Sequence, residues 1–402
     1  RQRQMCIRDR RDGAEFFLDS TLGYEDGTVE GVGVAIDSLH EDVSPGDVLL
    51  LNDGMIELEV DRIEGTRVFT TVTVGGILSD HKGINKRGGG LSAKALTDID
   101  KQNIKLAAEL EMDFLAVSFV RTADDVNEAR ELFQAAGGNG HIVAKIERAE
   151  AIDNIDEIVE AADIIMVARG DLGVEVGYTE LIGLQKKLIR KTRKGSKVVI
   201  TATQMMESMI HSPIPTRAEV SDVSNAVMDG TDAVMLSGET AVGDHPVKAI
   251  KAMAEVCLGA EKFRLEAGRT RHRLDDQFRY VDEAIAMAVM YAANHLHVRA
   301  IIALTESGST TRWMSRIRSD IPIYAFTPLP ATSRRVSVYR GVYPVHFRIG
   351  GEDRENLYGD MFRTMLDKQL VSVGDLVIFT RGDMHGVSGG TNSMTILRVE
   401  DR

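Results

Sequence analysis

The sequence predicts an α/β protein built around a (β/α)₈ barrel, with a small β-rich lid domain and a further α/β domain at the C-terminus. Three observations support this class. Residues 14–81 contain short alternating strands separated by glycine turns. Residues 82–262 alternate buried strands with amphipathic helices, which is the pattern of a parallel sheet. Residues 275–402 repeat that alternation in a second block.

The segment 14–81 is predicted to form a small antiparallel β-barrel that acts as a lid. Its stretch GDVLLLNDGMIELEV places an Asn-Asp-Gly turn between two apolar runs, and VFTTVTV alternates apolar and polar residues. Residues 1–13 are left outside this domain. Five arginines fall within the first eleven residues and no apolar run follows them, so this part is interpreted as a non-native or disordered leader.

Five buried strands are expected in the barrel segment, and helices are expected between them. The helix after the first strand should begin at Thr122, with Asp125 at capping-box spacing, and end near Gly137. The five strands are predicted over residues 113–120, 141–147, 163–170, 197–205 and 232–240.

Polar side chains recur where these strands end, at intervals of 24 to 34 residues, about one βα repeat. In a closed barrel the carboxyl ends of the strands form the mouth of the active site, so these side chains should lie at one level. Lys145 and Glu147 are two positions apart in a strand and should share a face. The residues at the strand ends are Ser118, Lys145, Glu147, Asp171, Thr203 and Ser237.

Two carboxylates on neighbouring strands, Glu147 and Asp171, suit a hard divalent cation. Lys145 beside them would add an ammonium for an oxyanion, as phosphoryl transfer or an enolate requires. Other interpretations stay open, since a Lys-x-Glu pair is commonly a solvated rim pair and Asp171 could cap a helix. Gly170 and Gly173 favour a site, because glycine lets the backbone approach a ligand closely.

The C-terminal block, residues 275–402, is predicted to hold strands at 300–305, 322–327 and 375–382, with an apolar helix at 282–296. Its turn TESGSTT joins a strand to a helix and could present amides and hydroxyls to a phosphate, although an ordinary helix-start turn has the same residues. The candidate effector-binding residues in this turn are Thr305, Ser307, Gly308, Ser309 and Thr310.

Composition narrows the functional class. A net charge of −13 disfavours nucleic acid and anionic membranes as partners and leaves small molecules. The two cysteines, Cys6 and Cys257, are too few for a disulfide framework and badly spaced for structural zinc, which fits a reducing cytoplasm. The apolar stretch 284–293 is too short to span a bilayer.

Three ordered motifs carry a family resemblance. IVAKIERAEAIDNIDEI, MVARGDLGVEV and the long run from VVITATQMMESM to AVMLSGETA closely resemble pyruvate kinase, from about residue 14 to the C-terminus. The post-lid segment KGINKRGGGLSAKALT is similar to one bacterial form of the family. The resemblance implies transfer of a phosphoryl group from phosphoenolpyruvate to ADP, and a lid inserted after the third barrel strand.

The resemblance also implies roles for residues. Lys145 corresponds to the catalytic lysine, Glu147 and Asp171 to ligands of Mg²⁺ or Mn²⁺, and Thr203 to a substrate threonine placed in the proton relay. Lys82 is a candidate nucleotide contact. The turn at 305–311 corresponds to a sugar-phosphate or nucleotide effector loop, and the family is commonly tetrameric. The substrate-binding set is expected to be Ser118, Lys145, Gly170, Asp171 and Thr203.

The resemblance further implies that the chain begins inside the lid, with the first three barrel strands and the K⁺ ligands not included. We therefore expect barrel strands 4–8 and low activity for the chain as written, because five strands do not close an eight-stranded barrel. Two alternatives are kept. One is a magnesium-dependent enolate lyase on a similar barrel, which needs no nucleotide. The other is a non-catalytic effector-binding fragment.

Overall fold

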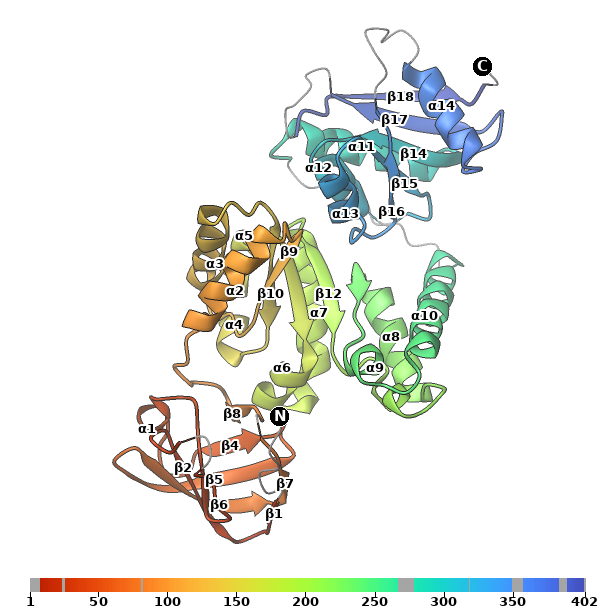
Figure 1. Cartoon of the computed structure of the whole chain (residues 1–402). Coiled ribbons are helices and arrows are strands. Elements are labelled where there is room, and N and C mark those ends of the chain that lie inside the picture. Colours follow the sequence, from red (N-terminus) through yellow and green to blue (C-terminus); the bar gives the residue numbers. More distant parts are fainter. Residues whose placement is uncertain are drawn as a thin grey trace. The chain divides into compact units, whose positions relative to one another are not determined.

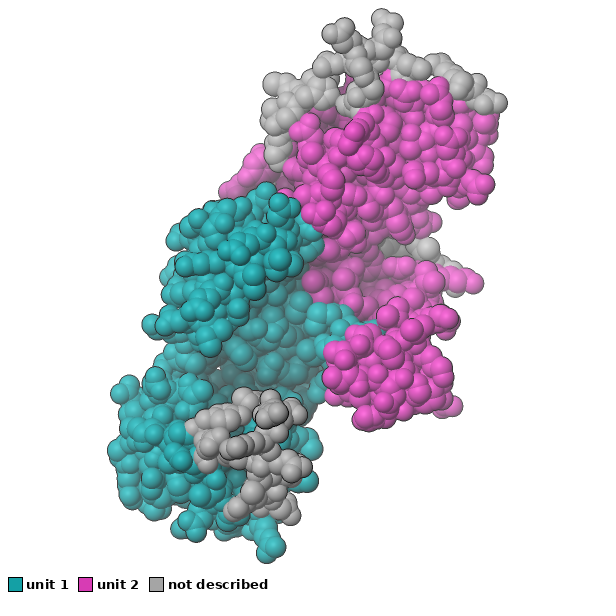
Figure 2. Space-filling view, viewed as in Figure 1, with its two compact units in different colours: residues 1–191, 201–205, 235–237 teal, residues 192–200, 206–234, 238–402 magenta. Residues whose placement is uncertain are grey.

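The computed structural model describes residues 8–23, 26–80, 82–266, 278–317, 319–348, 357–382 and 389–400. The chain divides into two compact units (Figure 2). The first contains residues 1–191, 201–205 and 235–237, and the second contains residues 192–200, 206–234 and 238–402. Residues 1–7 of the expected leader lie outside the described residues, whereas residues 8–10 form a strand.

The lid segment of the first unit is a six-stranded sheet with the order β3-β2-β6-β5-β4-β8 (red to orange in Figure 1). Neighbouring strands are antiparallel except β2 and β3, which are parallel. The strands are β2 (Glu15–Asp19), β3 (Gly31–Gly33), β4 (Val48–Leu51), β5 (Ile56–Glu64), β6 (Arg67–Val74) and β8 (Ile84–Lys86), with helix α1 (Leu39–Asp42) before β4. A separate antiparallel pair joins β1 (Arg8–Arg10) to β7 (Gly76–Leu78).

The alternating patterns of the lid strands explain its core. Alternate residues in the first half of β5 and along β6 are buried in one apolar cluster, namely Ile56, Leu58, Val60, Val68 and Val72. The expected turn between β4 and β5 is present, and Asn52, Asp53 and Gly54 all have positive φ. Strand β8 was not expected, because KGINKR reads as a polar loop; pairing with β4 makes it a strand.

The barrel segment is a five-stranded sheet with the order β13-β12-β11-β10-β9. The pairs β9–β10 and β10–β11 are parallel, and β11 is buried along its whole length, as a strand covered on both faces requires. The strands are β9 (Phe114–Val117), β10 (His141–Ile146), β11 (Ile164–Ala168), β12 (Val198–Ala202) and β13 (Ala233–Val234).

Helices connect these strands as the repeat predicts, and in the first unit α2, α3 and α5 form a layer beside β9 and β10 (Figure 1). The predicted capping box of Thr122 with Asp125 is formed, and Thr216 with Glu219 forms another at the start of α8. The helices are α2 (Asp98–Glu109), α3 (Ala123–Ala135), α4 (Ala149–Asp153), α5 (Ile155–Ala161), α6 (Arg169–Val176), α7 (Tyr178–Lys194), η1 (Glu207–Ile210), α8 (Arg217–Asp229), α9 (Gly238–Ala241) and α10 (Pro246–Glu266).

The C-terminal segment of the second unit holds a five-stranded sheet with the order β16-β15-β14-β17-β18. The strands are β14 (Val298–Leu304), β15 (Ile323–Thr327), β16 (Val342–His346), β17 (Leu376–Arg381) and β18 (Ser393–Arg398), and the helices are α11 (Val281–His295), α12 (Ser309–Ser315), α13 (Pro330–Val336) and α14 (Leu357–Asp367). Sequence analysis missed β16 and β18, and both lie at sheet edges. Pro344 within β16 is tolerated there because an edge strand leaves one side of its backbone unpaired.

A buried ion pair joins two parts of the second unit. The guanidinium of Arg316, at the C-terminal end of α12, pairs with the carboxylate of Asp232, and both side chains are almost fully buried. Arg316 also donates to the carbonyl of Lys197, while Asp232 accepts from the backbone N–H of Val199 at 3.0 Å.

Among the described residues, no helix combines the length and apolarity needed to cross a bilayer.

One carboxylate organises an end of the lid sheet. Asp19, the last residue of β2, accepts hydrogen bonds from the N–H and hydroxyl of Thr21, from the Thr66 hydroxyl and from Arg67 Nε. Its side chain is 5% exposed. The backbone bond from Thr21 is the largest of the effects that hold the pKa of Asp19 at about 2.

Replacing this carboxylate should destabilise the protein in a pH-dependent way. Asp19→Ala leaves several donors unsatisfied, so we expect a loss of about 2 kcal/mol in the free energy of unfolding at pH 7, measured by urea denaturation. The folded-state pKa lies below the unfolded value, so this stabilisation is present above about pH 4 and disappears as the pH falls toward 2. Asp61→Ala, at an exposed lid position, should change stability by less than about 0.5 kcal/mol. Equal losses in the two variants would contradict this role of Asp19.

Candidate active site

The candidate site lies where the strands of the barrel sheet end, within the first unit. Ser118 follows β9, Glu147 follows β10, and Asp171 is the third residue of α6, directly after β11. Thr203 follows β12. Parallel strands bring these positions to one edge of the sheet, which is how residues far apart in the chain become neighbours.

Lys145 lies between two of these positions. Its Nζ is 2.6 Å from Glu147 Oε1 and donates to Ser118 Oγ at 2.8 Å. The side chain of Lys145 is 25% exposed, while that of Glu147 is 2% exposed. The ammonium therefore bridges two strand ends and keeps one side open to solvent, where a ligand can reach it.

Glu147 is held from its other oxygen by the backbone. Its Oε2 accepts from the N–H of Phe119 at 2.7 Å. Phe119 has a φ of 54°, in the left-handed region that residues other than glycine seldom adopt. The buried carboxylate thus has an ammonium on one oxygen and an amide on the other, which is the pairing a buried charge needs.

Asp171 carries the least compensated charge of the site. Its pKa is raised to about 6, first by burial, then by the negative charges of Glu147 and Asp53, while Lys145 lowers it. The negative charge of Glu147 is therefore close enough to Asp171 to disfavour its ionised form. Two acids facing one ammonium leave net negative charge, and oxygen donors of this kind suit a hard divalent cation.

Gly170 and Thr203 are linked directly. The N–H of Gly170, near the start of α6, donates to Thr203 Oγ1 at 2.7 Å, and that hydroxyl donates to the carbonyl of Ala202 at 2.7 Å. Thr203 and the following Gln204 have φ of 66° and 52°. The end of β12 is therefore bent sharply, and the bend holds the Thr203 hydroxyl against the helix start.

Arg169 is a site-forming residue that sequence analysis missed. It is buried and donates to the carbonyls of Ala202, Thr203 and Gln204, the last residue of β12 and the two residues with positive φ. A guanidinium that binds consecutive carbonyls stabilises the unusual bend. The available signal was a second charged residue, close to Asp171, in the run MVARGDLG.

The sequence suggested that both glycines of this motif allow close ligand approach, and the structure gives one of them, Gly173, a packing role instead. A Cβ on Gly173 would lie 3.1 Å from Leu181 and 3.4 Å from Tyr178, so the lack of a side chain there serves packing against α7. A Cβ on Gly170 would meet Thr203 only at ordinary contact distance, 3.6 Å. For Gly173, therefore, the structural reason lies inside the protein.

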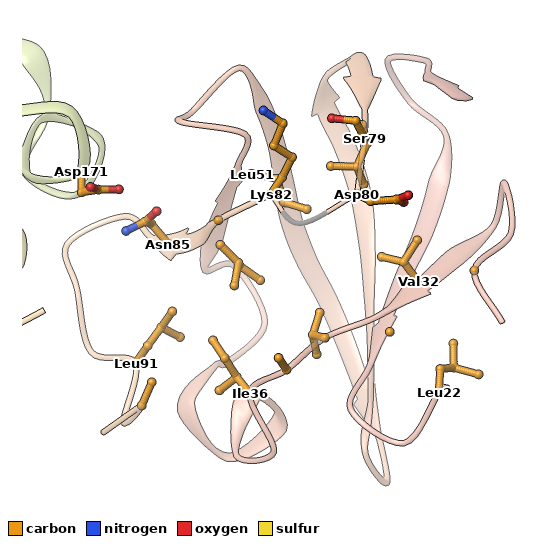
Figure 3. Close-up of a pocket in the computed structure, with 18 of the residues that line it drawn as sticks. Leu22, Val32, Ile36, Leu51, Ser79, Asp80, Lys82, Asn85, Leu91 and Asp171 are labelled. Carbon is orange, nitrogen blue, oxygen red and sulfur yellow. The ribbon is translucent and has the colours of Figure 1, made fainter. Parts of the chain in front are cut away.

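A cavity of about 670 Å³ adjoins the site within the first unit. Lys82, Asn85 and Asp171 line it together with apolar lid residues (Figure 3). Leu22, Val32 and Ile36 are among the apolar residues labelled there. Its volume falls in the range of small-molecule sites, and it places the exposed ammonium of Lys82 in the same space as the carboxylate of Asp171.

The candidate effector turn lies in the second unit, and its polar groups bond to one another and to Asp282 and Thr391. Gly308 has a φ of 84°, and its N–H donates to Thr305 Oγ1 at 2.9 Å. Ser309 Oγ donates to the buried Asp282 at 3.0 Å, and Ser307 Oγ accepts from the N–H of Ser309. Thr310 and Thr391 share a hydrogen bond of 2.6 Å between hydroxyls.

Among the described residues there is no cluster of three or more His, Cys, Asp or Glu side chains able to hold a metal ion by themselves. A cation at Glu147 and Asp171 would therefore have two protein carboxylates and need further oxygens from water or a ligand. Mg²⁺ is bound in this way by many enzymes, since it usually keeps several waters.

Comparison with known proteins identifies two family models in the chain. Residues 9–250 match the model "Pyruvate kinase, barrel domain" and residues 283–397 match "Pyruvate kinase, alpha/beta domain". Together they account for the predicted barrel and C-terminal domains, so the predicted fold class is confirmed.

Three relatives illustrate the similarity. The chain is 53% identical over 392 residues to pyruvate kinase II of Salmonella typhimurium, covering 96% of this chain and 81% of the relative. It is 53% identical to the pyruvate kinase of Haemophilus influenzae, with 96% and 81% covered. It is 42% identical to the pyruvate kinase of Geobacillus stearothermophilus, with 93% of this chain and 64% of the relative covered.

The charges around Asp171 predict how its titration responds to neighbours. Glu147→Gln removes a negative charge and should lower the pKa of Asp171 from about 6 by about one pH unit, whereas Lys145→Met should raise it. The shift is measurable by NMR titration of ¹³C-labelled aspartate carboxyls in metal-free protein. Glu131→Gln, at an exposed position of α3, should leave the pKa unchanged. If neither Glu147→Gln nor Lys145→Met changes the pKa of Asp171, the charges of these neighbours do not influence its titration.

Proposed function

The chain belongs to the pyruvate kinase family, whose members transfer the phosphoryl group of phosphoenolpyruvate to ADP, and we propose that Lys145, Glu147 and Asp171 carry out this reaction here. The observation that carries the assignment of residues is the position of Lys145 Nζ. It lies 2.6 Å from one carboxylate and 2.8 Å from Ser118 Oγ, at the strand ends and partly open to solvent.

Lys145 supplies the positive charge that the reaction needs. As the phosphoryl group leaves phosphoenolpyruvate, negative charge spreads over the phosphoryl oxygens and the enolate oxygen. An ammonium already held in place by Glu147 and Ser118 stabilises that charge without reorganising first. Lys145 is therefore assigned as the catalytic lysine.

Glu147 and Asp171 are assigned as the ligands of Mg²⁺ or Mn²⁺. The donor set fits, because both are carboxylates, and the pKa of Asp171 is raised first by burial and then by negative charge that one lysine does not neutralise. A bound divalent cation supplies charge neutralisation on the phosphoryl oxygens. We also assign a K⁺ requirement on the family resemblance; activity in K⁺ compared with Na⁺ buffer tests it.

The substrate is placed between Lys145 and the start of α6. The backbone at Gly170 and Asp171 lies at a helix N-terminus, which favours a carboxylate. The hydroxyl of Thr203 already bonds Gly170 N–H, so substrate binding competes for or shares that bond. We assign Thr203 to substrate binding and to the proton path toward the enolate, with Ser118 as a further contact.

The nucleotide is placed in the adjoining cavity, with Lys82 as a phosphate contact. An exposed ammonium in the same cavity as Asp171 supports this position, because the β-phosphate of ADP must reach the transferred group. In this arrangement the lid segment covers the reacting atoms, and excluding water favours transfer to ADP over hydrolysis.

The remaining assignments extend the family resemblance to the whole protein. We assign a lid at residues 14–81, a catalytic domain at 82–262 and a regulatory domain at 275–402. The regulatory domain would bind a sugar-phosphate or nucleotide effector through the turn at 305–311, and the enzyme would act as a homotetramer in the cytoplasm. Effector titration of the assay below and sedimentation of the protein test these two points.

Lys145→Met is the direct test of the catalytic assignment. It preserves side-chain length and removes the charge, so kcat for ATP formation should fall about 10²- to 10³-fold. The assay uses the protein produced from its complete gene, with phosphoenolpyruvate, ADP and Mg²⁺. Lys101→Met is the matched control, since Lys101 forms a surface ion pair with Glu128 on neighbouring helices.

Two outcomes would reject the proposal. Turnover that survives Lys145→Met unchanged would remove the lysine from the mechanism. Cleavage of a 2-keto acid that requires no ADP would instead favour a metal-dependent lyase acting at the same carboxylates.

A further inference from the structure

A second buried acid, Glu175, lies one helical turn after Asp171 on α6. Its side chain is 2% exposed. The reaction as assigned above makes no use of it. A buried carboxylate must be compensated by hydrogen bonds or charge, so its partners indicate what it holds in place.

The partners of Glu175 come from two other segments. Its Oε2 accepts from the N–H of Ala149, the first residue of α4 and two residues after Glu147, at 2.8 Å. Its Oε1 accepts from Asn85 Nδ2 in strand β8 at 3.2 Å, and Arg148 Nε lies 3.9 Å away. One carboxylate therefore contacts the chain that carries Glu147, the helix that carries Asp171 and the last strand of the lid sheet.

The segment that follows β8 is seated on the same elements. The N–H of Gly88 donates to the carbonyl of Glu175 at 3.0 Å. The N–H of Gly90 donates to Glu150 Oε1 at 2.7 Å, and Arg148 Nη2 donates to the carbonyl of Leu91 at 2.6 Å. Between these contacts Gly89 has a φ of 82°, and an added Cβ would lie 3.0 Å from Glu150 Oε2.

We propose that Glu175 is a positioning residue that sets the spacing of the carboxylates of Glu147 and Asp171 and ties that spacing to strand β8 of the lid sheet. The inference rests on the metal site assigned under the proposed function. Metal ligands must be held within about 0.5 Å of the productive geometry, and Glu175 connects the two backbone segments that carry them. Cation binding thereby stabilises the position of β8, and correct placement of β8 strengthens cation binding.

The isosteric variant Glu175→Gln is the sharpest probe. It keeps the volume of the side chain, but one of its two terminal atoms becomes an NH₂ donor. That donor must face either the N–H of Ala149 or the NH₂ of Asn85, and both are donors. Either the link to Ala149 is lost, or the amide of Asn85 must flip to accept from the new NH₂ group, and no cavity is created in either case.

The experiment titrates Mn²⁺ alone into the full chain and measures free Mn²⁺ by electron paramagnetic resonance. Glu175→Gln should weaken Mn²⁺ binding about 10- to 100-fold, the range seen when partners of metal ligands are removed. In parallel, Mn²⁺ should slow hydrogen exchange across residues 82–91 in the unmodified protein, and much less in the variant.

Asp163→Asn is the matched control. Asp163 lies at the opposite end of the same strand pair, where its Oδ2 accepts from the N–H of Ile142 at 2.9 Å and pairs with Arg130. A change in stability alone predicts similar losses of Mn²⁺ affinity in both variants. Positioning predicts wild-type affinity for Asp163→Asn, even if that variant is less stable.

A second variant covers the case in which Glu175→Gln does not fold, as judged by circular dichroism. Asn85→Ala removes only the link to β8 and should weaken Mn²⁺ binding about 10-fold, the low end of the same range. Wild-type Mn²⁺ affinity in folded Glu175→Gln, or in folded Asn85→Ala if the first variant does not fold, would overturn the positioning role. Failure of the catalytic proposal looks different, because Mn²⁺ binding would then still depend on Glu175, yet Lys145→Met would leave ATP formation unchanged in the assay described above.

Discussion

The burial of Glu147 is the constraint on which the candidate site depends. A carboxylate with a side chain only 2% exposed is stable only if both oxygens have partners, and here these are the ammonium of Lys145 and the amide of Phe119. The pair fixes where the ammonium points. Because Ser118 holds it from another strand, Lys145 stands at the strand ends with one side open.

The unusual backbone at the site follows from the same requirement. Phe119 takes a left-handed conformation whose N–H bonds Glu147 Oε2, and Thr203 and Gln204 take similar conformations under the guanidinium of Arg169. Such conformations cost about 1–3 kcal/mol each and persist only where surrounding contacts enforce them. Here those contacts are made by Glu147 and Arg169 at the strand ends. The charged groups that form the site therefore also enforce the strained backbone.

The buried carboxylates around the site are compensated to different degrees. At Glu147 the negative charge is matched, whereas at Asp171 burial and two nearby acids raise the pKa to about 6. Glu175, one turn further along α6, accepts two N–H hydrogen bonds and lies near Arg148, but burial still raises its pKa. A cation beside Asp171 would offset negative charge that Lys145 alone does not neutralise.

The sequence by itself determined the fold class, the βα repeat and the list of polar residues at strand ends, because strand alternation, capping boxes and turn glycines act over a few neighbouring residues. It also indicated that Lys145 and Glu147 share a face. It did not indicate strand β8, whose residues are mostly polar, or strand β16, which contains a proline. Each becomes a strand only by pairing with its neighbour at the edge of a sheet. Nor could it indicate the roles of Phe119, Arg169 and Glu175, since each acts on residues 26 to 90 positions away in the chain. Such contacts arise only when the strands are laid side by side, and for that reason tertiary structure alone decided which charges are paired and which carboxylate has its pKa raised by burial and neighbouring acids.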